Sequence, residues 1–551
     1  MKTQLTWEHP YTPAPQYSKR AAYFSMEFGI DHIFRIYSGG LGYLAGSHMR
    51  SAYELKQNMI GIGMLWKFGY YEQIRDQQSM MKAQYRERFY TFLEETDLSV
   101  ELHINGNPVR VHVWYLDPKV FNTVPMYFLT TDREGANDYL SRTITHRLYD
   151  SNAATRVAQS IVLGIGGAKV VEALGGADIY HMNEAHALPL AFHLYEQLGD
   201  VAKVKDKVVF TTHTPEMAGN ETRDINFLQR MGFFAGLDLD TVREISQHPQ
   251  GDAFGYTPAA LTLAKKANGV SQLHAKVSNQ MWAGVNNKPE IIGITNAQNQ
   301  RYWQDPELKA AMEADDIDAL KARKRALKQQ LFKFVADQTG NLFDPDVLTI
   351  VWARRFAAYK RADLIMHNLQ DFYQLLQQTQ HPVQVIWAGK PYPEDEGAID
   401  MFNRLIQMTH LAPNATVVTG YEMDVSALLK LGSDVWLNNP RRPREASGTS
   451  GMTAAMNASV NFSINDGWIP EFAKHGHNSF VIPEADETQP IHVQDDHDYQ
   501  HLMRILKEDI LPCYYDTPDK WWQIVVNGMQ EVVPYFDAGR MAGEYYDKLF
   551  N

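Results

Sequence analysis

Residues 444–466 bring together a carboxylate, hydroxyl side chains and glycine immediately ahead of a predicted helix. The carboxylate is Glu445, and the small residues that follow it are Ser447, Gly448, Thr449 and Ser450. Backbone N–H groups at the start of a helix can bind an anion, and the helix dipole adds partial positive charge there. Glycine also lets a phosphate approach the backbone closely. The stretch therefore predicts a phosphate cradle beside a carboxylate, with an ordinary glycine-rich helix start as the alternative.

Four cationic residues lie within eight positions, directly after a predicted strand at Val347–Trp352. They are Arg354, Arg355, Lys360 and Arg361. Arginine makes bidentate contacts with phosphate, and lysine supplies a point charge. On an exposed helix such a cluster is usually a solvated face, but at a strand end, in a chain of net charge −13, it indicates an anionic ligand. Lys390 follows the next strand and occupies the same kind of position.

Several cations, a helix start and neutral polar side chains together suit glycosyl transfer to or from a phosphate. Such a site stabilises the phosphate as the glycosidic bond loosens, which is electrostatic rather than nucleophilic catalysis. A glycosidase with two carboxylates is another hypothesis, because acidic candidates exist at Glu184, Glu216, Glu445 and Glu471. That hypothesis gives the cationic residues no role.

The first half of the chain places further polar residues at the ends of predicted strands. These strands are residues 21–26, 178–182 and 208–212. The glycines Gly39, Gly40 and Gly42 follow the first strand and open a helix, while His186 and His213 follow the other two. The carboxyl ends of parallel strands are where α/β proteins keep their sites. Taken singly, each histidine is more typical of a hydrogen-bonded structural residue, and the glycines also suit tight packing of a helix against a sheet.

Strands alternate with helices along most of the chain, which predicts an α/β fold with mostly parallel sheets. Two domains facing each other across a cleft account for the length of 551 residues. We predict a first Rossmann-like domain over residues 1–300, with a β-rich insertion, and a second over 301–515. A helical segment, 516–551, is expected to cross back to the first domain.

Composition argues against several classes of protein. The net charge of −13, from 52 cationic and 65 acidic residues, opposes general binding of nucleic acid. The single cysteine, Cys513, excludes a disulfide within the chain and a cysteine-based metal site, and no metal is predicted. The start lacks the apolar core of a signal peptide, and no apolar run of about 18 residues suggests a membrane span. We therefore expect a cytoplasmic, soluble protein with no membrane partner.

The chain resembles the α-glucan phosphorylase family, particularly its shorter bacterial branch, over nearly its whole length. The motifs that carry the resemblance are, in the family's order, YFSMEFGI, IYSGGLGYLAG, HMNEAHA, TTHTPEMAG, WARRFAAYKRA, WAGK, EASGTSGM and NDGW. The resemblance implies the GT-B fold and phosphorolysis of α-1,4-glucan (glycogen, starch or maltodextrin) to α-glucose 1-phosphate, with retention of configuration. Its second substrate would be inorganic phosphate or a sugar-phosphate donor. Homodimers are usual in the family.

The matching motifs also imply roles for individual residues. The catalytic set would be His213, through its main-chain carbonyl, with Arg355, Lys360 and Glu445. The residues expected at the sugar or substrate are Gly39, Gly40, Gly42, His186, Ser447 and Gly448. The residues expected to cradle or flank phosphate are Gly448, Thr449, Ser450, Arg354, Arg361 and Lys390. The cradled group in the family is the phosphate of pyridoxal phosphate.

Thr453 departs from the family pattern. Family members carry at this position the lysine that forms a Schiff base with pyridoxal phosphate, and a hydroxyl cannot form an imine. One hypothesis is a phosphorylase that holds the cofactor non-covalently or through a distant lysine such as Lys390. A second is a cofactor-free retaining glucosyltransferase whose nucleotide-sugar donor places its distal phosphate in the cradle. A third is a catalytically silent α-glucan-binding protein, against which the intact cationic residues count.

Overall fold

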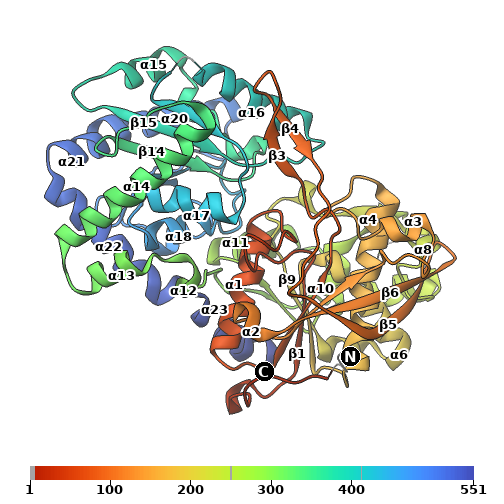
Figure 1. Cartoon of the computed structure of the whole chain (residues 1–551). Coiled ribbons are helices and arrows are strands. Elements are labelled where there is room, and N and C mark those ends of the chain that lie inside the picture. Colours follow the sequence, from red (N-terminus) through yellow and green to blue (C-terminus); the bar gives the residue numbers. More distant parts are fainter. Residues whose placement is uncertain (1–5, 249–250, 411) are drawn as a thin grey trace. The chain divides into compact units, whose positions relative to one another are not determined.

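The computed structural model describes residues 6–248, 251–410 and 412–551. These residues form two compact units. The first contains the chain up to Tyr70, Tyr85–Asn299 and Ala538–Asn551, and the second contains Tyr71–Gln84 and Gln300–Asp537. Each unit has one large sheet with helices packed against it (Figure 1). The predicted α/β class with large parallel sheets is confirmed.

The first unit is built on a nine-stranded sheet in the order β13-β12-β9-β8-β1-β2-β7-β6-β5. Its strands are β1 (Ala21–Phe24), β2 (Met59–Met64), β5 (Glu94–Ile104), β6 (Asn107–Leu116), β7 (Met126–Thr130), β8 (Ile179–Asn183), β9 (Val208–Thr211), β12 (Lys266–Gly269) and β13 (Ile291–Gly293). The pairs β5–β6 and β6–β7 are antiparallel, and the other pairs are parallel. Because β1, β8 and β9 are parallel neighbours, the polar residues that follow them share one edge of the sheet.

Helices cover this sheet, and a short two-stranded ladder accompanies them. The helices are α1 (Gly40–Glu54), α2 (Pro118–Phe121), α3 (Tyr139–Thr143), α4 (Ala153–Ile161), α5 (Gly167–Ala173), α6 (Pro189–Leu198), α7 (Val201–Lys207), α8 (Ile225–Met231), α9 (Leu239–Ser246), α10 (Tyr256–Leu263), α11 (Gln272–Met281) and α23 (Ala538–Glu544). The ladder pairs β10 (Thr222–Asp224) with β11 (Ala253–Gly255). The C-terminal helix α23 packs alongside α1 (Figure 1).

The second unit has a six-stranded, wholly parallel sheet in the order β16-β15-β14-β17-β18-β19. The strands are β14 (Leu348–Ala353), β15 (Val383–Ala388), β16 (Ala415–Val418), β17 (Val435–Asn438), β18 (Val460–Ile464) and β19 (Ser479–Ile482). The chain winds outward from β14 to β16, returns to pair β17 with β14, and then winds the other way. The order therefore reverses between β14 and β17, and ligands of such sheets bind at the carboxyl ends beside this switch point.

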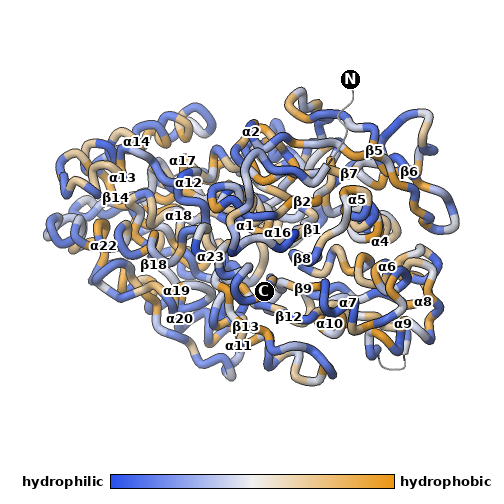
Figure 2. The backbone as a smooth tube through the Cα atoms, turned by 90° about the horizontal axis from the view of Figure 1, so that it is seen from below, coloured by the Kyte–Doolittle hydropathy of each residue, from blue (hydrophilic) through white to orange (hydrophobic). Residues whose placement is uncertain are grey.

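Helices lie against the second sheet as well. They are α12 (Gln300–Trp303), α13 (Pro306–Glu313), α14 (Ile317–Thr339), α15 (Leu369–Gln377), α16 (Glu396–Thr409), α17 (Met423–Gly432), α18 (Ser450–Met456), α19 (Ile469–Phe472), α20 (Ile491–Ile505), α21 (Leu511–Tyr515) and α22 (Pro518–Phe536). The longest of these, α14, begins where the Asp316 side chain caps the backbone N–H of Ala319 and ends at Gly340 in a left-handed conformation. Hydrophilic and hydrophobic residues alternate along α14 and α22, as expected for helices with one buried face (Figure 2).

Helix α18 is buried from several sides. Ala454 packs into the core that α14 and α17 form against the sheet. Met452 and Met456 pack instead against Trp468 and the apolar face of α22, including Phe536. The helix that follows the predicted phosphate cradle is therefore part of the core of its unit.

For two segments, the division into units differs from the predicted domain boundaries. The hairpin of β3 (Glu72–Arg75) and β4 (Met81–Gln84) belongs to the second unit, where the Gln73 amide donates to the carbonyl of Gly389 at 2.9 Å. The predicted tail 516–551 divides after Asp537. Its helix α22 packs on α18 in the second unit, whereas α23 belongs to the first.

Among the described residues, no helix combines the length and the apolar character that crossing a membrane requires.

Candidate active site

The residues predicted to bind phosphate meet a buried carboxylate at the switch point of the second unit. Glu445 lies in the loop after β17, and its side chain is 8% exposed. Lys360, which follows β14, donates to Glu445 Oε2, and Arg354 Nη1 lies 3.8 Å from the same oxygen. Both the cations and the carboxylate thus sit at the strand ends where a doubly wound sheet binds its ligand.

The charges at this point favour an anion. Burial opposes ionisation of Glu445, but the positive charges of Lys360, Arg354 and Arg355 hold its pKa below the usual range. Three cationic side chains therefore surround one ionised carboxylate. The net charge of the cluster is positive, and this charge can bind an anionic ligand. Since Arg355 is exposed, its guanidinium can reach a ligand that enters from solvent.

Asp466 supports the Glu445 loop and is a site residue that sequence reasoning missed. Its Oδ2 accepts the backbone N–H of Glu445 at 2.9 Å, and its Oδ1 accepts that of Gly467 at 2.8 Å. Burial raises the pKa of Asp466 to about 7. The motif NDGW, quoted above for its resemblance alone, contains the aspartate that positions Glu445.

The raised pKa of Asp466 predicts a pH dependence of stability. Between about pH 4 and pH 7 the folded protein holds a proton that the unfolded chain has released, so the free energy of unfolding falls as the pH rises through this window. We expect this fall, about 4 kcal/mol at most, to disappear in Asp466→Asn. Denaturant unfolding of both proteins between pH 4 and pH 8 measures it. If the two stabilities differ by the same amount at every pH, the assignment to Asp466 is wrong.

The loop between Glu445 and α18 has the properties of a ligand cradle. Gly448 has a left-handed backbone (φ +85°), which glycine adopts without strain. The hydroxyl of Ser447 is buried and has no hydrogen-bond partner among the described residues, so it can bind a ligand hydroxyl or oxyanion. Ser450 instead accepts a hydrogen bond from the Trp436 indole at 3.2 Å. The structure thus brings Ser447 and Gly448 to the same loop as Glu445.

Two other predicted phosphate residues have protein partners. The Arg361 guanidinium donates to the carboxylates of Asp495 and Asp498 and to the main-chain carbonyls of Asn439 and Pro440. Arg361 therefore braces the chain that leaves β17. Lys390 is buried, donates to Glu422 at the start of α17, and donates to the carbonyl of Tyr71 at 2.6 Å.

In the first unit, the glycine-rich turn after β1 wraps around a buried carboxylate. Glu27 accepts hydrogen bonds from the backbone of Ser38 at 2.6 Å and Gly39 at 3.1 Å, and burial raises its pKa. A Cβ atom on Gly42 would lie 2.7 Å from Glu27 Oε2, so this position requires glycine. A Cβ atom placed on Gly39 or Gly40 would have no described heavy atom within 4 Å, which leaves these two backbone units open to a ligand.

The two predicted histidines lie at the carboxyl ends of β8 and β9. Glu184 accepts the backbone N–H of His213 at 2.8 Å, and the His213 ring contacts Asn183 Oδ1 at 2.7 Å. Burial lowers the pKa of His213 to about 3, so the ring is neutral at physiological pH. His186 packs beside Tyr149 with ring centroids 5.6 Å apart, and its buried Nδ1 has no partner among the described residues. The acidic candidate Glu184 thus fixes the backbone of His213.

Comparison with known proteins places the chain. Residues 262–509 match the family model described as carbohydrate phosphorylase. The maltodextrin phosphorylase of Thermococcus litoralis is 31% identical over 613 aligned positions, which cover the whole of this chain and 72% of that protein. This chain belongs to the carbohydrate phosphorylase family. The glycogen phosphorylase of Mycobacterium tuberculosis is 31% identical over 96% of this chain and 70% of its own length. The uncharacterized protein MJ1631 of Methanocaldococcus jannaschii is 47% identical over 97% of this chain and all of its own length.

The phosphorylase family has the GT-B fold, with which the two parallel-sheet units agree. Its members typically use pyridoxal phosphate. Thr453 is 1% exposed in the middle of α18, and its hydroxyl donates to the Ser450 carbonyl at 3.0 Å. Because this side chain has no amine and is bonded within its own helix, Thr453 itself cannot hold pyridoxal phosphate as an imine.

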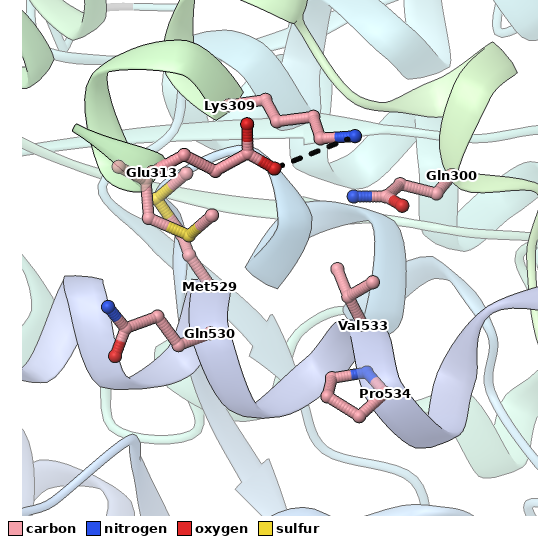
Figure 3. A pocket seen from close by; sticks show the side chains of 8 residues that line it. Gln300, Lys309, Glu313, Met529, Gln530, Val533 and Pro534 are labelled. Carbon is pink, nitrogen blue, oxygen red and sulfur yellow. Dashed lines mark ion pairs between the residues drawn. The ribbon is translucent and has the colours of Figure 1, made fainter.

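A separate surface pocket lies between α13 and α22 (Figure 3). Lys309 and Glu313 form an ion pair at 3.8 Å on one wall, and Met529, Val533 and Pro534 line the other. None of the predicted site residues lines it. The pocket is therefore distinct from the Glu445 cluster.

Proposed function

We propose that this phosphorylase-family protein transfers glucosyl units between α-glucan and a phosphate-bearing partner, with retention at the anomeric carbon. Its nominal reaction is phosphorolysis of α-1,4-glucan to α-glucose 1-phosphate. The observation that carries the proposal is the cluster of Arg354, Arg355 and Lys360 around the buried Glu445. The chain has a net charge of −13, but these three cations make the switch point of the second sheet locally positive. A locally positive site of this kind favours phosphate as its ligand.

In this proposal the cations bind phosphate oxygens and lower the free energy of the charge that develops during transfer. A phosphate oxygen forms the bond to the anomeric carbon, the glycosidic C–O bond breaks, and the proton of the phosphate goes to the departing glucan oxygen. Glu445 and the hydroxyl of Ser447 hold hydroxyl groups of the glucosyl unit. The Asp466 hydrogen bond to the Glu445 backbone keeps this loop in place during the reaction.

In the first unit, Glu184 and Asn183 fix His213, so that its main-chain carbonyl is held in one orientation. Its ring is neutral and acts as a packing and hydrogen-bonding group. The open backbone at Gly39 and Gly40 is the part of the same unit that we assign to substrate contact.

A second candidate function is favoured by Thr453. Without an imine at this position, a nucleotide-sugar donor can place its distal phosphate where the family holds the cofactor phosphate. The reaction would then release a nucleoside diphosphate and require no pyridoxal phosphate. A silent glucan-binding protein is disfavoured because nothing in such a role requires buried cations beside an ionised carboxylate.

The test is chain extension of maltodextrin with different glucosyl donors. We expect extension with α-glucose 1-phosphate and release of inorganic phosphate. If extension occurs only with nucleoside diphosphate glucose, the second candidate replaces the first. If no donor supports extension but maltodextrin binds, both transfer proposals are wrong.

A further inference from the structure

Glu184 has a backbone conformation that is nearly confined to glycine. It directly follows β8, with φ 73° and ψ 165°. A bulky L residue seldom has a positive φ, and this combination of angles is found essentially only in glycine because a side chain collides with the backbone there. Such strain persists where the surrounding structure imposes it, and strained residues are concentrated at functional sites. The contacts of Glu184 identify what imposes the strain.

The strained residue departs from regular strand geometry. Neighbouring residues of a β-strand point to opposite faces of the sheet. Asn183, the last residue of β8, contacts the His213 ring at 2.7 Å, and Glu184 accepts the backbone N–H of His213 at 2.8 Å. Two consecutive side chains thus reach one residue, which lies just after the neighbouring strand β9. The positive φ of Glu184 accounts for this departure.

Both carboxylate oxygens of Glu184 accept hydrogen bonds. Oε1 accepts the backbone N–H of Ala185 at 3.2 Å, and Oε2 accepts the Thr214 hydroxyl at 3.1 Å in addition to the bond from His213. The residue is 9% exposed, and burial raises its pKa while these bonds oppose the rise. A general acid must direct its proton at an oxygen of the substrate. Because the oxygens of Glu184 are engaged with the chain, its contacts favour a positioning role over the acid role of a glycosidase.

We propose that Glu184 is a positioning residue of the glucosyl site and that its backbone strain is retained for this role. The inference rests on the proposed function, in which the main-chain carbonyl of His213 contributes to glucosyl transfer. The N–H that Glu184 holds comes before this carbonyl in the chain, and the Thr214 hydroxyl comes after it. The carboxylate therefore holds the chain on both sides of the carbonyl.

Paired substitutions by alanine and glycine measure the strain independently of activity. Both remove the carboxylate, but only glycine also relieves the backbone. We expect Glu184→Gly to unfold at a temperature several degrees above that of Glu184→Ala. At ordinary positions the order is reversed, because glycine loses more backbone entropy on folding. If Glu184→Ala unfolds at the same or a higher temperature, the backbone is not strained and the proposal is wrong.

Glu244 provides a matched control in the same unit. It is an exposed glutamate within α9, where the backbone is helical. Glu244→Gly should unfold at a lower temperature than Glu244→Ala, as is usual in a helix. Both variants should keep kcat within about twofold of the unaltered protein. If glycine is the more stable variant at both positions, the order at Glu184 does not report strain and the proposal loses its support.

Kinetics of maltodextrin extension measure the positioning role. Glu184→Ala and Glu184→Gly should each lower kcat by about 100-fold, because a small displacement of a group that acts on the transition state has an effect of this order. KM should change much less than kcat, since the interaction is made mainly in the transition state. A change confined to KM, or no change in either constant, would contradict the proposal.

Glu184→Gln separates positioning from proton transfer. Glutamine keeps the size of the side chain and one acceptor oxygen, so it should recover at least about tenfold in kcat over Glu184→Ala. The pH dependence of kcat/KM should keep the shape that it has in the unaltered protein. If Glu184→Gln is no more active than Glu184→Ala, or loses one limb of the pH profile, the positioning role is wrong.

The inference can fail separately from the proposed function. Full activity in Glu184→Ala would refute the role of Glu184 and leave glucosyl transfer standing. If the unaltered protein were inert with every donor, the proposed function would be refuted, and the role of Glu184 in it as well.

Discussion

Replacement of Lys360 by methionine should lower kcat/KM for glucosyl transfer by about 1,000-fold. Lys360 is the cation bonded to Glu445, and its removal leaves a buried carboxylate with less compensating charge at the point where phosphate binds. Loss of one preorganised electrostatic partner of a transition state typically costs about 100- to 1,000-fold in rate. The higher figure is expected here because two interactions, with phosphate and with Glu445, are lost together. Steady-state kinetics with α-glucose 1-phosphate and maltodextrin measure the effect.

Two further variants separate this effect from a general loss of charge. Lys474 forms an ion pair with Glu531 at 2.9 Å but is 63% exposed, so Lys474→Met should leave kcat/KM within about twofold. Lys360→Arg keeps the charge in a different shape and should recover part of the activity. Full activity in Lys360→Met would show that the pair with Glu445 is structural.

Replacement of Gly467 by alanine should lower activity, because Gly467 lies beside the loop that carries Glu445 and Ser447. Gly467 has φ +61°, and a Cβ atom there would lie 2.3 Å from the carbonyl oxygen of Ser447. Something in the loop must move, and displacements of about 1 Å can cost roughly 100-fold in rate. We expect a loss of activity of that order and a fall in the free energy of unfolding of about 3 kcal/mol, from strain and overlap combined.

Gly476 provides a matched control. It also has a left-handed backbone (φ +71°), but no described heavy atom lies within 4 Å of a Cβ placed there. Gly476→Ala should therefore cost only the backbone strain, about 1 kcal/mol, with activity retained. Equal effects of the two substitutions on activity would mean that the overlap with Ser447 does not matter.

Much of the architecture follows from local patterns in the sequence. The run Val383–Ala388 predicts a strand, and β15 spans the same residues. Apart from Gln384 the run is apolar, as is typical of strands buried on both faces of a parallel sheet. The motifs also place Glu445 and Lys360 in the same region of the fold, because both follow strands that are neighbours in the sheet.

What the sequence could not reveal were contacts between distant segments. Arg361 binds Asp495 and Asp498, which lie more than one hundred residues further along the chain. The local sequence does not show these bonds, so it predicted that the guanidinium would bind phosphate. The role of Asp466 could not be predicted from the sequence, because Asp466 comes near Glu445 only when β18 pairs with β17 in the sheet.

The most direct test of glucosyl transfer at the Glu445 cluster is an NMR time course with maltodextrin and inorganic phosphate. We predict that α-glucose 1-phosphate accumulates, in the α configuration from the first turnover, and that Lys360→Met slows its formation by about 1,000-fold. Absence of glucosyl phosphate would contradict the nominal phosphorolysis. If the protein also failed to extend maltodextrin from α-glucose 1-phosphate and from nucleoside diphosphate glucose, the assignment of this site to glucosyl transfer would be refuted.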